Sequence, residues 1–578
     1  MIHPSGASPS PDPPAASPSR PAITKLLVAN RGGIARRIFR TAKEMGIATV
    51  AVFTEADRDA LFAGEADEAL ALDRLSDRGP GAYLDAPALV EAARRAGADA
   101  VHPGDGFLAE DPGFAWRCAE AGVLFVGPSP EAIATMGSKL EAKTVAAGAG
   151  VPVLSAEEVD GYPPGKLEAA AEVLGWPVVV KASAGRGGRG MRVVREGDDL
   201  VAAVESARRE AVSAFGDGTV FLEPWLEAAR HVEVQIFGDA TGRVVHLFDR
   251  DCSLQRHHRT VVGEAPAPRL TAALRERLHT AAVAVGESVG YVGAGTVEFL
   301  VSGEQFWFLE MDTRLQVEHP VTEAVLGLDL VRMQLAAAEG RPLPVEARHC
   351  SPSGHAVEAR LYAEDPGGGP GPEPGRLRRF EIPSGPGVRV ETGVASGSEV
   401  GSADDPLLAK VVAHAATRAE ALRRLAAALA GARIHGLPTN RDALVAALHD
   451  ADVVAGGVDT GFFDRHHDRL CGPRGGEAAL RLHAAAAALA GPGAGWSSFR
   501  GPAGERVEVL CTAGPAGVVA GVEVDGVPLP GLRVGARHAD AVDLEVDGVR
   551  RLVRLSRAGT VVDVDSVLGH TELVVLDP

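Results

Sequence analysis

Apolar and polar residues alternate with clear periods in the first part of the chain. An apolar run at residues 25–30 is followed by a segment with helical spacing at residues 34–45 and by a second apolar run at residues 48–53. A strand, a helix and a strand in this order predict a β-α-β unit with parallel strands. Two further units of this kind follow. The pattern therefore predicts a doubly wound α/β domain over residues 23–135.

The next region, residues 136–341, mixes long helices with alternating strands. Within it, residues 231–237 and 243–248 alternate as strands do, and a turn at residues 239–242 joins them. Two alternating runs around a short turn are typical of an antiparallel hairpin. We therefore expect a second domain in which helices and strands are mixed.

Residues 354–470 predict a third, α/β domain. A Gly/Pro loop at residues 366–375 can be neither helix nor central strand, and a strong helical pattern follows near Arg418–Ala430.

Residues 477–578 begin with a helix and continue with short strands and Asp-Gly turns, at Asp525-Gly526 and again at residues 547–548. Asp-Gly pairs connect hairpin strands. We expect a small β-rich module with an antiparallel sheet or a partial barrel.

Composition narrows the class of protein. The 58 lysine and arginine residues against 77 aspartate and glutamate residues give 58 − 77 = −19, which argues against a nucleic-acid backbone as partner. Five cysteines are scattered without zinc or disulfide spacing, as expected in a reducing cytoplasm. No apolar stretch is long enough to span a bilayer. Residues 1–22 are rich in Pro, Ser and Ala and lack the apolar core of a signal peptide, so we expect a disordered tail and a cytoplasmic protein.

A dense group of charged residues follows the apolar run at residues 305–309. Alternation along a strand would place Glu310, Asp312 and Arg314 on one face. Carboxylates in such a position can bind a hard cation such as Mg²⁺, and an arginine beside them can bind a small oxyanion through paired hydrogen bonds. A solvated polar edge is the alternative. We interpret this segment as an active site.

Two lysines stand out because arginine supplies most of the positive charge. Lys181 ends an apolar run and precedes the glycine-rich segment 182–191, whose backbone N–H groups could close over a triphosphate. Lys139 follows Gly137 and Ser138 and could be a second phosphate lysine. A flexible hairpin is the alternative for the glycine-rich segment, and a solvated side chain is the alternative for Lys139.

Three further segments favour a binding site. Glu298 lies among apolar neighbours and needs a partner, for which Mg²⁺ shared with Glu310 is the natural candidate. Residues 220–226 could present backbone groups to an adenine edge or could be ordinary core. Residues 249–259 suit an anion pocket, whereas the two adjacent histidines in this segment diverge too much to share a metal ion easily.

In this order, these segments resemble the biotin carboxylase family of the ATP-grasp ligases, from about residue 23 to residue 464. The matching motifs are Val28–Gly32, Arg250–Ser253, Glu264–Pro268, Arg314–Glu323, His355–Arg360 and Ala363–Pro366. The resemblance implies an ATP-grasp domain at residues 136–341 and the family's C-terminal α/β domain at residues 354–470. The module at residues 477–578 is similar to the domain that docks the carboxyltransferase partner in acyl-CoA carboxylase α subunits.

The resemblance also implies a role for individual residues. The ATP-binding residues would be Lys139, Lys181, Gly187, Gly188, Glu223, Leu226, His231, Gln255 and His258. The ligands of Mg²⁺ or Mn²⁺ would be Glu298, Glu310 and Asp312. The bicarbonate-binding residues would be Arg314, Gln316, Val317 and Glu318. Glu318 would be the general base and Arg360 would stabilise the enolate form of biotin, so the catalytic residues would be Arg314, Glu318 and Arg360.

The reaction that the resemblance implies has three steps. Deprotonated bicarbonate would take the γ-phosphoryl group of ATP and form carboxyphosphate. Carboxyphosphate would then break down to CO₂ and phosphate, and the ureido nitrogen of biotin would capture the CO₂. Water has to be excluded, because free carboxyphosphate hydrolyses.

Several positions depart from the family pattern. Thr260 lies where the family has a lysine that faces bicarbonate and the γ-phosphate, and Asp312 lies where it has an asparagine. Ala184 and Arg186 replace glycines of the phosphate loop, where a side chain could obstruct backbone approach. Other differences are at Gly33, Asp105, Gly263 and Asp404–Pro406. The loss of one cation beside the transferring phosphoryl group would cost roughly a few kcal/mol of barrier, although Arg259 or Arg186 could supply the charge instead.

Lysine is absent after Lys410, and the sequence has no Met-Lys dipeptide. Family members that carry their own biotin attach it to a lysine of a C-terminal carrier domain. We therefore expect biotin on a separate carrier protein, a separate carboxyltransferase subunit as partner, and a homo-oligomer as in relatives. The leading hypothesis is the biotin carboxylase component of an acyl-CoA carboxylase. One alternative is a catalytically impaired homologue that binds nucleotide and acts as a scaffold or regulator, and another is an ATP-grasp ligase with a different acceptor.

Overall fold

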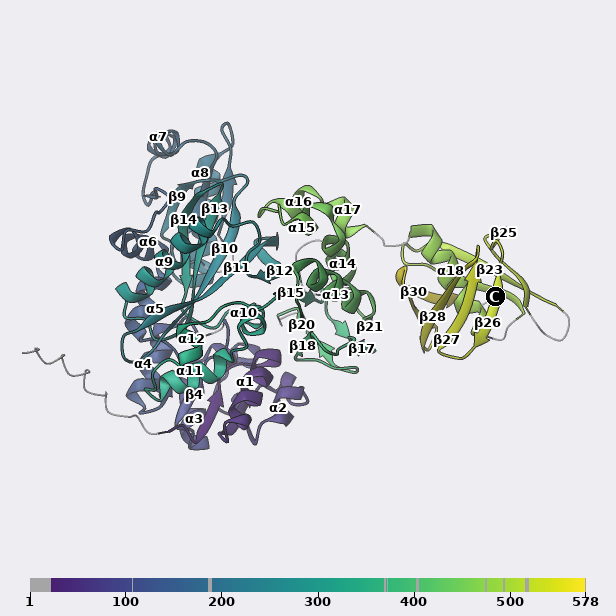
Figure 1. The fold of residues 1–578 in the computed structure, drawn as a ribbon, viewed down its shortest axis with the longest axis horizontal. Coiled ribbons are helices and arrows are strands. Elements are labelled where there is room, and N and C mark those ends of the chain that lie inside the picture. The colour runs from purple at the N-terminus through teal and green to yellow at the C-terminus, as the bar shows by residue number, and fades with distance from the viewer. Residues whose placement is uncertain are drawn as a thin grey trace, which may run out of the picture. The chain divides into compact units, whose positions relative to one another are not determined.

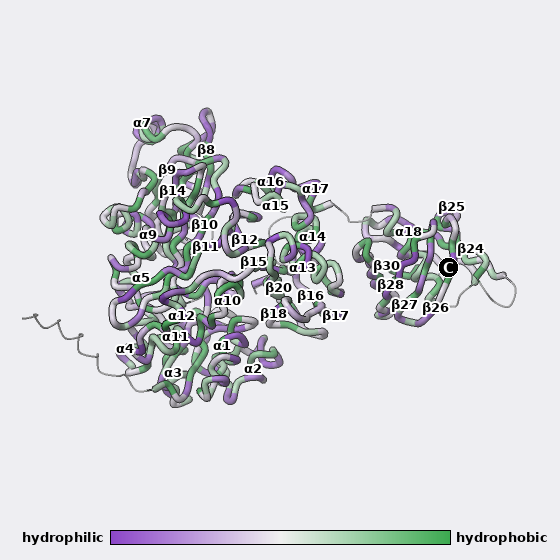
Figure 2. The backbone as a smooth tube through the Cα atoms, viewed as in Figure 1, coloured by the Kyte–Doolittle hydropathy of each residue, from purple (hydrophilic) through white to green (hydrophobic). Residues whose placement is uncertain are grey.

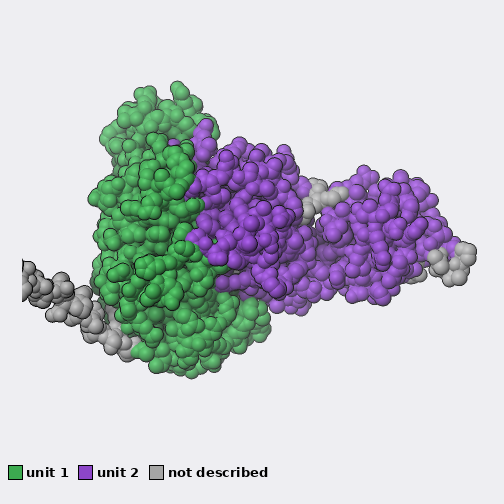
Figure 3. All heavy atoms as spheres, in the orientation of Figure 1, with its two compact units in different colours: residues 1–225, 233–249, 271–351 green, residues 226–232, 250–270, 352–578 purple. Residues whose placement is uncertain are grey.

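The computed structural model of the protein describes residues 22–106, 108–185, 190–367, 371, 373–401, 405–472, 476–491, 494–514 and 519–576. The chain divides into two compact units (Figure 3). Unit 1 contains residues 1–225, 233–249 and 271–351, and unit 2 contains residues 226–232, 250–270 and 352–578. Several of the expectations above lie outside the described residues, namely the tail as far as residue 21, Arg186, Gly187, Gly188, Asp404 and parts of the glycine-rich segment 182–191 and of the Gly/Pro loop 366–375.

Unit 1 begins with a five-stranded parallel sheet (Figure 1). Its strands are β1 (Lys25–Val28), β2 (Ala48–Phe53), β3 (Glu68–Ala71), β4 (Ala100–His102) and β5 (Leu124–Phe125). Their order is β3-β2-β1-β4-β5, and each neighbouring pair runs parallel. The order changes direction at β1, which is the topology of a doubly wound sheet. This confirms the predicted β-α-β organisation.

Helices pack on both faces of this sheet. They are α1 (Gly32–Glu44), α2 (Leu61–Glu65), α3 (Ala86–Ala96) and α4 (Pro112–Glu120). Leu26 of β1 packs in one core with residues of α1, whereas its neighbour Leu27 packs in another core with residues of α3 and α4. Successive side chains of a strand point to opposite faces, so both faces of β1 are covered. Helix α1 begins before the predicted residue 34, because Gly32 with φ of +62° permits the sharp turn after Arg31.

A second sheet of unit 1 has the strand order β6-β9-β7-β8, with antiparallel neighbours. The strands are β6 (Glu157–Glu158), β7 (Val178–Ala182), β8 (Arg192–Val194) and β9 (Val220–Pro224). The helices of this region are α5 (Pro130–Gly137), α6 (Lys139–Gly148), α7 (Pro164–Leu174) and α8 (Leu200–Phe215). Every residue of β7 is buried, which explains its continuous apolar run up to Lys181.

The other strands of unit 1 belong to a larger sheet in which β14, β13, β10 and β11 are neighbours. The strands are β10 (Arg230–Gly238), β11 (Val244–Arg256), β13 (Gly293–Ser302) and β14 (Gln305–Asp312). The helices are α9 (Ala272–Ser288), α10 (His319–Leu326), α11 (Leu330–Ala338) and α12 (Val345–Arg348). The Asp239 N–H donates to the Arg243 carbonyl at 3.0 Å in the predicted turn between β10 and β11. Strands β10 and β11 each carry residues of both units.

Unit 2 contributes a run of antiparallel strands in the order β11-β12-β15-β20-β18. Its strands before the module are β12 (Arg259–Ala265), β15 (His355–Tyr362), β16 (Gly375–Arg376), β17 (Arg379–Glu381), β18 (Val388–Thr392), β19 (Glu399–Val400), β20 (Leu407–Ala415) and β21 (Arg433–His435). The helices are α13 (Arg418–Ala430), α14 (Arg441–His449), α15 (Ala451–Ala455), α16 (Phe462–Arg465) and α17 (His467–Cys471). Helix α13 has the predicted bounds, since the Thr417 side chain caps its first turn by accepting the Glu420 N–H.

The last part of unit 2 is a single helix against a nine-stranded sheet of order β25-β24-β23-β22-β30-β29-β28-β27-β26. The elements are α18 (Gly476–Leu489), β22 (Gly495–Arg500), β23 (Arg506–Ala513), β24 (Val519–Val524), β25 (Val527–Pro528), β26 (Arg533–Arg537), β27 (Ala541–Val546), β28 (Val549–Ala558), β29 (Val561–Ser566) and β30 (Gly569–Leu576). Asp525 and Gly526 have φ of +51° and +73°, as tight hairpin turns require. Helix α18 packs against β23, β24, β27, β28, β29 and β30. This confirms the predicted β-rich module.

Hydrophobic residues recur along the strands of both units (Figure 2). One core is shared by the parallel sheet and the strands β10, β11 and β13, whereas the module has a core of its own. Within the described ranges, none of the helices combines the length and the apolarity that crossing a membrane requires.

Candidate active site

The hairpin of β13 and β14 brings acidic side chains together in unit 1. Glu298 of β13 lies opposite Glu310 of β14, and Thr296 lies opposite Asp312. Directly opposed residues of an antiparallel pair project to the same face of the sheet. The hairpin register therefore gathers the three carboxylates that the sequence analysis assigned to a metal ion.

Gln316 connects two of these carboxylates. Its Nε2 donates to Glu298 Oε1 at 3.1 Å and also to Asp312 Oδ2. Burial raises the pKa of Asp312 well above its ordinary value, while the Arg314 guanidinium opposes this rise and the neighbouring acids Glu110 and Glu298 add to it. A buried carboxyl group with acidic neighbours has too little positive charge around it to stabilise its ionised form. The donor set of hard oxygen atoms fits Mg²⁺, and the raised pKa of Asp312 fits a site that would gain from a cation.

Arg314 is the centre of a hydrogen-bond network in unit 1. Its guanidinium donates to Glu110 Oε1 at 3.0 Å, to Gln316 Oε1 at 2.9 Å and to Asp312 Oδ2 at 3.0 Å. The nearby carboxylates raise the pKa of Arg314 against the effect of burial, so the group stays charged. The Arg314 side chain is 17% exposed.

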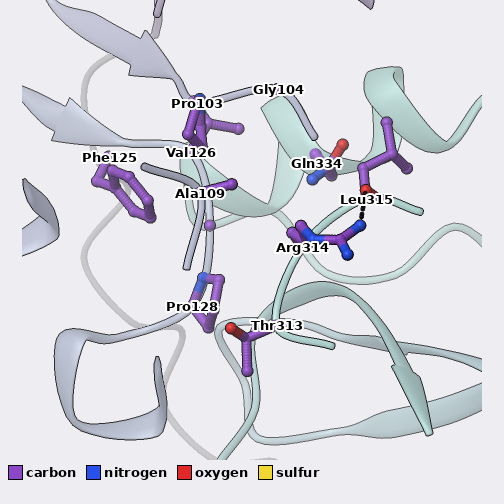
Figure 4. Close-up of a pocket in the computed structure, with 11 residues that line it drawn as sticks. Pro103, Gly104, Ala109, Phe125, Val126, Pro128, Thr313, Arg314, Leu315 and Gln334 are labelled. Atoms are coloured by element: carbon purple, nitrogen blue, oxygen red, sulfur yellow. Dashed lines mark hydrogen bonds between the residues drawn. The ribbon is translucent and has the colours of Figure 1, made fainter. Parts of the chain in front are cut away.

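A small cavity adjoins Arg314 (Figure 4). Pro103, Thr313, Leu315 and Gln334 are among its lining residues, and Arg314 donates to the Leu315 carbonyl at 3.4 Å there. Its volume is about 10 Å³, which is room for about one water molecule. This cavity is therefore too small to be the nucleotide site.

Three lysines lie around the end of β7. Lys181 Nζ lies 2.6 Å from Glu223 Oε2, and Lys143 forms an ion pair with the other oxygen of Glu223. Glu223, on β9, is 0% exposed. Burial would raise the pKa of Glu223, but the ammonium groups of Lys181 and Lys143 hold it below its ordinary value. The pairing keeps two ammonium groups at fixed positions in the interior of unit 1.

Lys139 links the lysines to the acids. It is the first residue of α6, its ammonium pairs with Glu310, and its N–H donates to the Ser183 carbonyl at 3.1 Å. Burial and the neighbouring Lys181 together lower the pKa of Lys139 to about 8, while Asp312 opposes the shift. A cationic group and an acidic group thus lie side by side, which suits a phosphate chain together with its metal ion.

Glu318 and Val317 follow on the same segment. Glu318 is the N-cap residue of α10 and is 2% exposed. Its charge acts on the Arg314 guanidinium and contributes to the raised pKa of that group. A buried carboxylate beside a fixed arginine is the arrangement expected of a base that works on an arginine-bound anion.

The other predicted site residues belong to unit 2. In it, Gln255 Nε2 lies 2.6 Å from His231 Nδ1 and donates to the Cys252 carbonyl at 2.9 Å, so two of the predicted ATP-binding residues contact each other. His258 is exposed in the turn between β11 and β12, with φ of +59°, and Leu226 is half-buried. That these residues form one ATP-binding site together with the cluster in unit 1 stays a prediction.

Arg360 also belongs to unit 2. It lies on β15 opposite Lys410, and its carbonyl accepts a hydrogen bond from Asn440 at 3.0 Å. The role of Arg360, like the roles of the other site residues, stays a prediction.

Two residues of the cluster were not predicted as site residues from the sequence. Lys143 shares Glu223 with Lys181, and Glu110 binds Arg314 although 204 residues separate the two in the sequence. The scarcity of lysine was a usable signal for Lys143. No comparable signal marked Glu110, because its segment carries no distinctive pattern around it.

Family models and relatives match most of the chain. The models "Biotin carboxylase, N-terminal domain", "Carbamoyl-phosphate synthase L chain, ATP binding domain" and "Biotin carboxylase C-terminal domain" match residues 22–133, 138–346 and 358–465. The chain is 46% identical over 445 residues to the biotin carboxylase of Halalkalibacterium halodurans, and the match covers 76% of this chain and 97% of that protein. The chain belongs to the biotin carboxylase family.

Longer proteins of the biotin carboxylase family are similar as well. The mitochondrial methylcrotonoyl-CoA carboxylase subunit alpha of Arabidopsis thaliana is 44% identical over 468 residues, and the match covers 80% of this chain but only 64% of that protein. Among solved structures, the biotin carboxylase domain dimer of the Hydrogenobacter thermophilus 2-oxoglutarate carboxylase has a TM-score of 0.75 and 38% identity. That match covers 78% of this chain and 99% of the solved chain, which was determined with MgADP, ADP and bicarbonate.

Proposed function

We propose that this chain is the biotin carboxylase component of an acyl-CoA carboxylase and carboxylates biotin with ATP and bicarbonate. The observation that carries the proposal is the arrangement in unit 1. Carboxylates from the β13–β14 hairpin lie beside Lys139 at the start of α6, and Arg314 and Glu318 follow on the same segment. Family membership supports the proposal, because relatives at 44% to 46% identity include biotin carboxylases and a carboxylase α subunit.

Lys139, Lys181 and the paired Glu223 would hold the nucleotide. In the structure Lys139 pairs with Glu310. On binding of a triphosphate, the Lys139 ammonium would turn to the phosphate oxygens and release Glu310. Mg²⁺ bound to Glu310, Glu298 and Asp312 would offset charge on the transferring phosphoryl group. Backbone N–H groups of the glycine-rich segment would complete this cradle.

Arg314, Gln316 and the Val317 backbone would hold bicarbonate, and Glu318 would remove its proton. Bicarbonate is a poor nucleophile until it is deprotonated. The resulting anion would attack the γ-phosphorus, which breaks the bond to ADP and forms carboxyphosphate. Carboxyphosphate would release CO₂ and phosphate. The released phosphate would take the proton of the biotin ureido nitrogen, and CO₂ would then form a bond to that nitrogen, while Arg360 would stabilise the enolate form of biotin.

The acceptor would be biotin on another protein. Residues 411–578 contain no lysine, so they offer no amine for biotin attachment. The module built around α18 would dock a carboxyltransferase subunit, as its sequence resemblance implies, and the protein would work in the cytoplasm as a homo-oligomer. The domain boundaries near residues 135, 341 and 470 belong to the same proposal.

One observation favours a second candidate function. Thr260, where the family has a lysine, is 7% exposed on β12 and lies opposite Gln255. A buried hydroxyl supplies no charge for a transferring phosphoryl group. A homologue that binds nucleotide without turnover and acts as a scaffold or regulator would tolerate this change.

The test is ADP release from MgATP and bicarbonate, measured with and without free biotin. Turnover that rises with biotin supports the carboxylase. Glu318→Gln should abolish this turnover, whereas the control Glu304→Gln, an exposed acid in the turn before β14, should leave it unchanged. Nucleotide binding without turnover would support the scaffold. Stimulation only by another acceptor would support a different ATP-grasp ligase.

A further inference from the structure

Two histidines and two aspartates meet within unit 2, far from the described acids of the active site in sequence. His435 ends β21, Asp563 and Asp565 lie on β29, and His570 lies on β30. His435 therefore comes from the α/β part of unit 2, and the other three come from the module. Within the described residues, one side-chain ligand atom from each of His435, Asp565 and His570 lies within 4.8 Å of the other two.

The two imidazole rings stack, and a carboxylate faces each edge of the stack. The ring centroids are 5.1 Å apart and the planes make an angle of 18°. On one edge, Asp565 lies 2.8 Å from His435 Nε2 and 3.1 Å from His570 Nδ1. On the other edge, Asp563 lies 3.8 Å from His435 Nδ1 and 3.6 Å from His570 Nε2. The contacts of Asp565 with the two rings are therefore shorter than those of Asp563.

This cluster is buried and incompletely paired. His435 is 0% exposed, Asp563 is 1% exposed and Asp565 is 9% exposed. Among the described residues, the buried His435 Nδ1 has no hydrogen-bond partner, and it lies 3.8 Å from Asp563 Oδ2. A buried polar atom without a partner is uncommon in native proteins, and a small shift of the ring towards Asp563 would satisfy it.

The charges around the cluster leave room for a cation. Arg378 donates to Asp563 at 3.0 Å and to Glu572 at 2.7 Å, and Arg433 donates to Asp565 at 3.3 Å. The three carboxylates therefore outnumber the two guanidinium groups by one.

We propose that His435 Nε2, Asp565 and His570 Nδ1 bind a divalent cation of the zinc class. Neutral imidazole nitrogens and a carboxylate oxygen are the ligands that zinc takes from proteins. Metal-bound histidines usually donate their second N–H to an outer carboxylate, and Asp563 faces the second nitrogen of both rings. The fourth position would hold water.

Metal binding requires the ligand atoms to adjust their spacing. Bonds of about 2.0 to 2.1 Å in a tetrahedron separate neighbouring ligand atoms by about 3.3 Å. Asp565 Oδ2 lies 2.8 Å from His435 Nε2, Asp565 Oδ1 lies 3.1 Å from His570 Nδ1, and one ligand atom of each residue lies within 4.8 Å of the others, so the rings would have to shift until both face the same ion. Because His435 and the two other ligands come from different parts of unit 2, the cation would hold the module against the α/β part.

The test uses the full chain, freed of metal with a chelator and then dialysed against Zn²⁺ or Co²⁺ in excess Mg²⁺. We expect one tightly held equivalent of Zn²⁺ by mass spectrometry, and visible ligand-field bands of tetrahedral type with Co²⁺. His570→Gln and Asp565→Asn should lose this equivalent. His449→Gln, in α14, and Glu310→Gln, in the active site, should retain it.

His570 is partly exposed at a hairpin, which makes a folding defect in His570→Gln less of a concern than one at buried His435. A second measurement does not depend on any variant. Zn²⁺ should shift the nitrogen-15 NMR signals of two imidazoles in the unaltered chain. In each of these rings, the metal-bound nitrogen should carry no proton. Absence of a tight equivalent, or an equivalent that survives in both His570→Gln and Asp565→Asn, would overturn the proposal and leave a purely hydrogen-bonded cluster.

Discussion

At the scale of single residues, Thr260 is the departure from the family pattern that bears most directly on the proposed carboxylase reaction. It is buried on β12 opposite Gln255, and the family has a cation there. Thr260→Lys should raise bicarbonate-dependent ADP release on the order of tenfold or more, since one donor to a developing charge accounts for about 10² to 10³ in rate. Initial rates at saturating MgATP measure this.

Thr260→Met is the matched control, because it adds a chain of similar length without a charge. It should leave the rate of ADP release unchanged. An equal increase in both variants would show that packing, rather than charge, limits the rate.

Lys139 predicts a pH dependence for nucleotide binding. Because its pKa is lowered to about 8, the ammonium is present below that pH and is lost as the pH rises through it. Bound phosphate favours the charged form, so the affinity for MgATP should fall above pH 8 by at most about tenfold per pH unit. Calorimetric titrations between pH 7 and pH 10, taken as about the useful range, measure this.

Lys139→Arg supplies the control for this prediction, since arginine stays protonated over the same range. Its affinity should stay level where that of the unaltered chain falls. A parallel fall in both proteins would place the titrating group elsewhere.

Much of the candidate site was visible in the sequence at this scale. Glu298, Glu310 and Arg314 stood out because charged residues at the ends of apolar strands are costly unless they are paired or bind ligands. Their partner Glu110 did not, since 204 residues separate it from Arg314 and only the fold brings the two together. Contacts of this kind follow from tertiary structure, which local patterns do not encode.

At the scale of elements, the buried ion pairs between β7, β9 and α6 are the feature with the clearest energetic consequence. Glu223 is 0% exposed and balances both Lys181 and Lys143. Glu223→Gln should lower the free energy of unfolding by about 3 to 5 kcal/mol, because two buried ammonium groups lose their counter-charge. Urea denaturation followed by circular dichroism measures the change.

Two further variants sharpen this measurement. Glu172→Gln, an exposed acid of α7, should leave the free energy of unfolding within about 0.5 kcal/mol of the original. The double change Glu223→Gln with Lys143→Met should recover part of the loss, because one uncompensated charge is removed with its partner. No recovery in the double variant would mean that the loss comes from packing alone.

Helices and hairpins with capping or turn residues at their ends were predictable from the sequence. Short strands that exist only through hydrogen bonding to a distant strand were not. Helix α13 has the predicted bounds because Thr417 caps its start and Gly431 follows its end. The turn at Asp525 and Gly526 was equally clear, as both residues adopt positive φ. The two-residue strands β16 and β19 exist only because they pair with each other across an irregular segment. Nothing in their own residues indicates a strand.

At the scale of the whole molecule, Arg378 connects the α/β part of unit 2 with the module. It donates to Asp563, which is 1% exposed, and to Glu572. Arg378→Ala should lower the free energy of opening at β29 and β30 by about 2 to 3 kcal/mol, since charge-assisted hydrogen bonds to a buried carboxylate are lost. Native-state hydrogen exchange of amides in these strands and in β21 measures it.

Arg376 offers a matched control two positions away. Its side chain is 67% exposed and lies 3.6 Å from the exposed Glu399. Arg376→Ala should leave the exchange of β29 and β30 unchanged, and both variants should keep bicarbonate-dependent ADP release. Equal exchange in Arg378→Ala and the unaltered chain would show that other contacts hold the module.

The passage of β10 and β11 through both units has a practical consequence for dissecting this protein. Residues 226–232 and 250–270 leave unit 1 and return to it, so no single cut in the chain releases either unit intact. A fragment that starts at residue 352 would lack β12, the neighbour of β15, and would expose that strand's edge. Such a fragment should aggregate when it is produced alone. Mixing it with residues 22–351, which contain β12, should restore its solubility only if β12 pairs with β15 again.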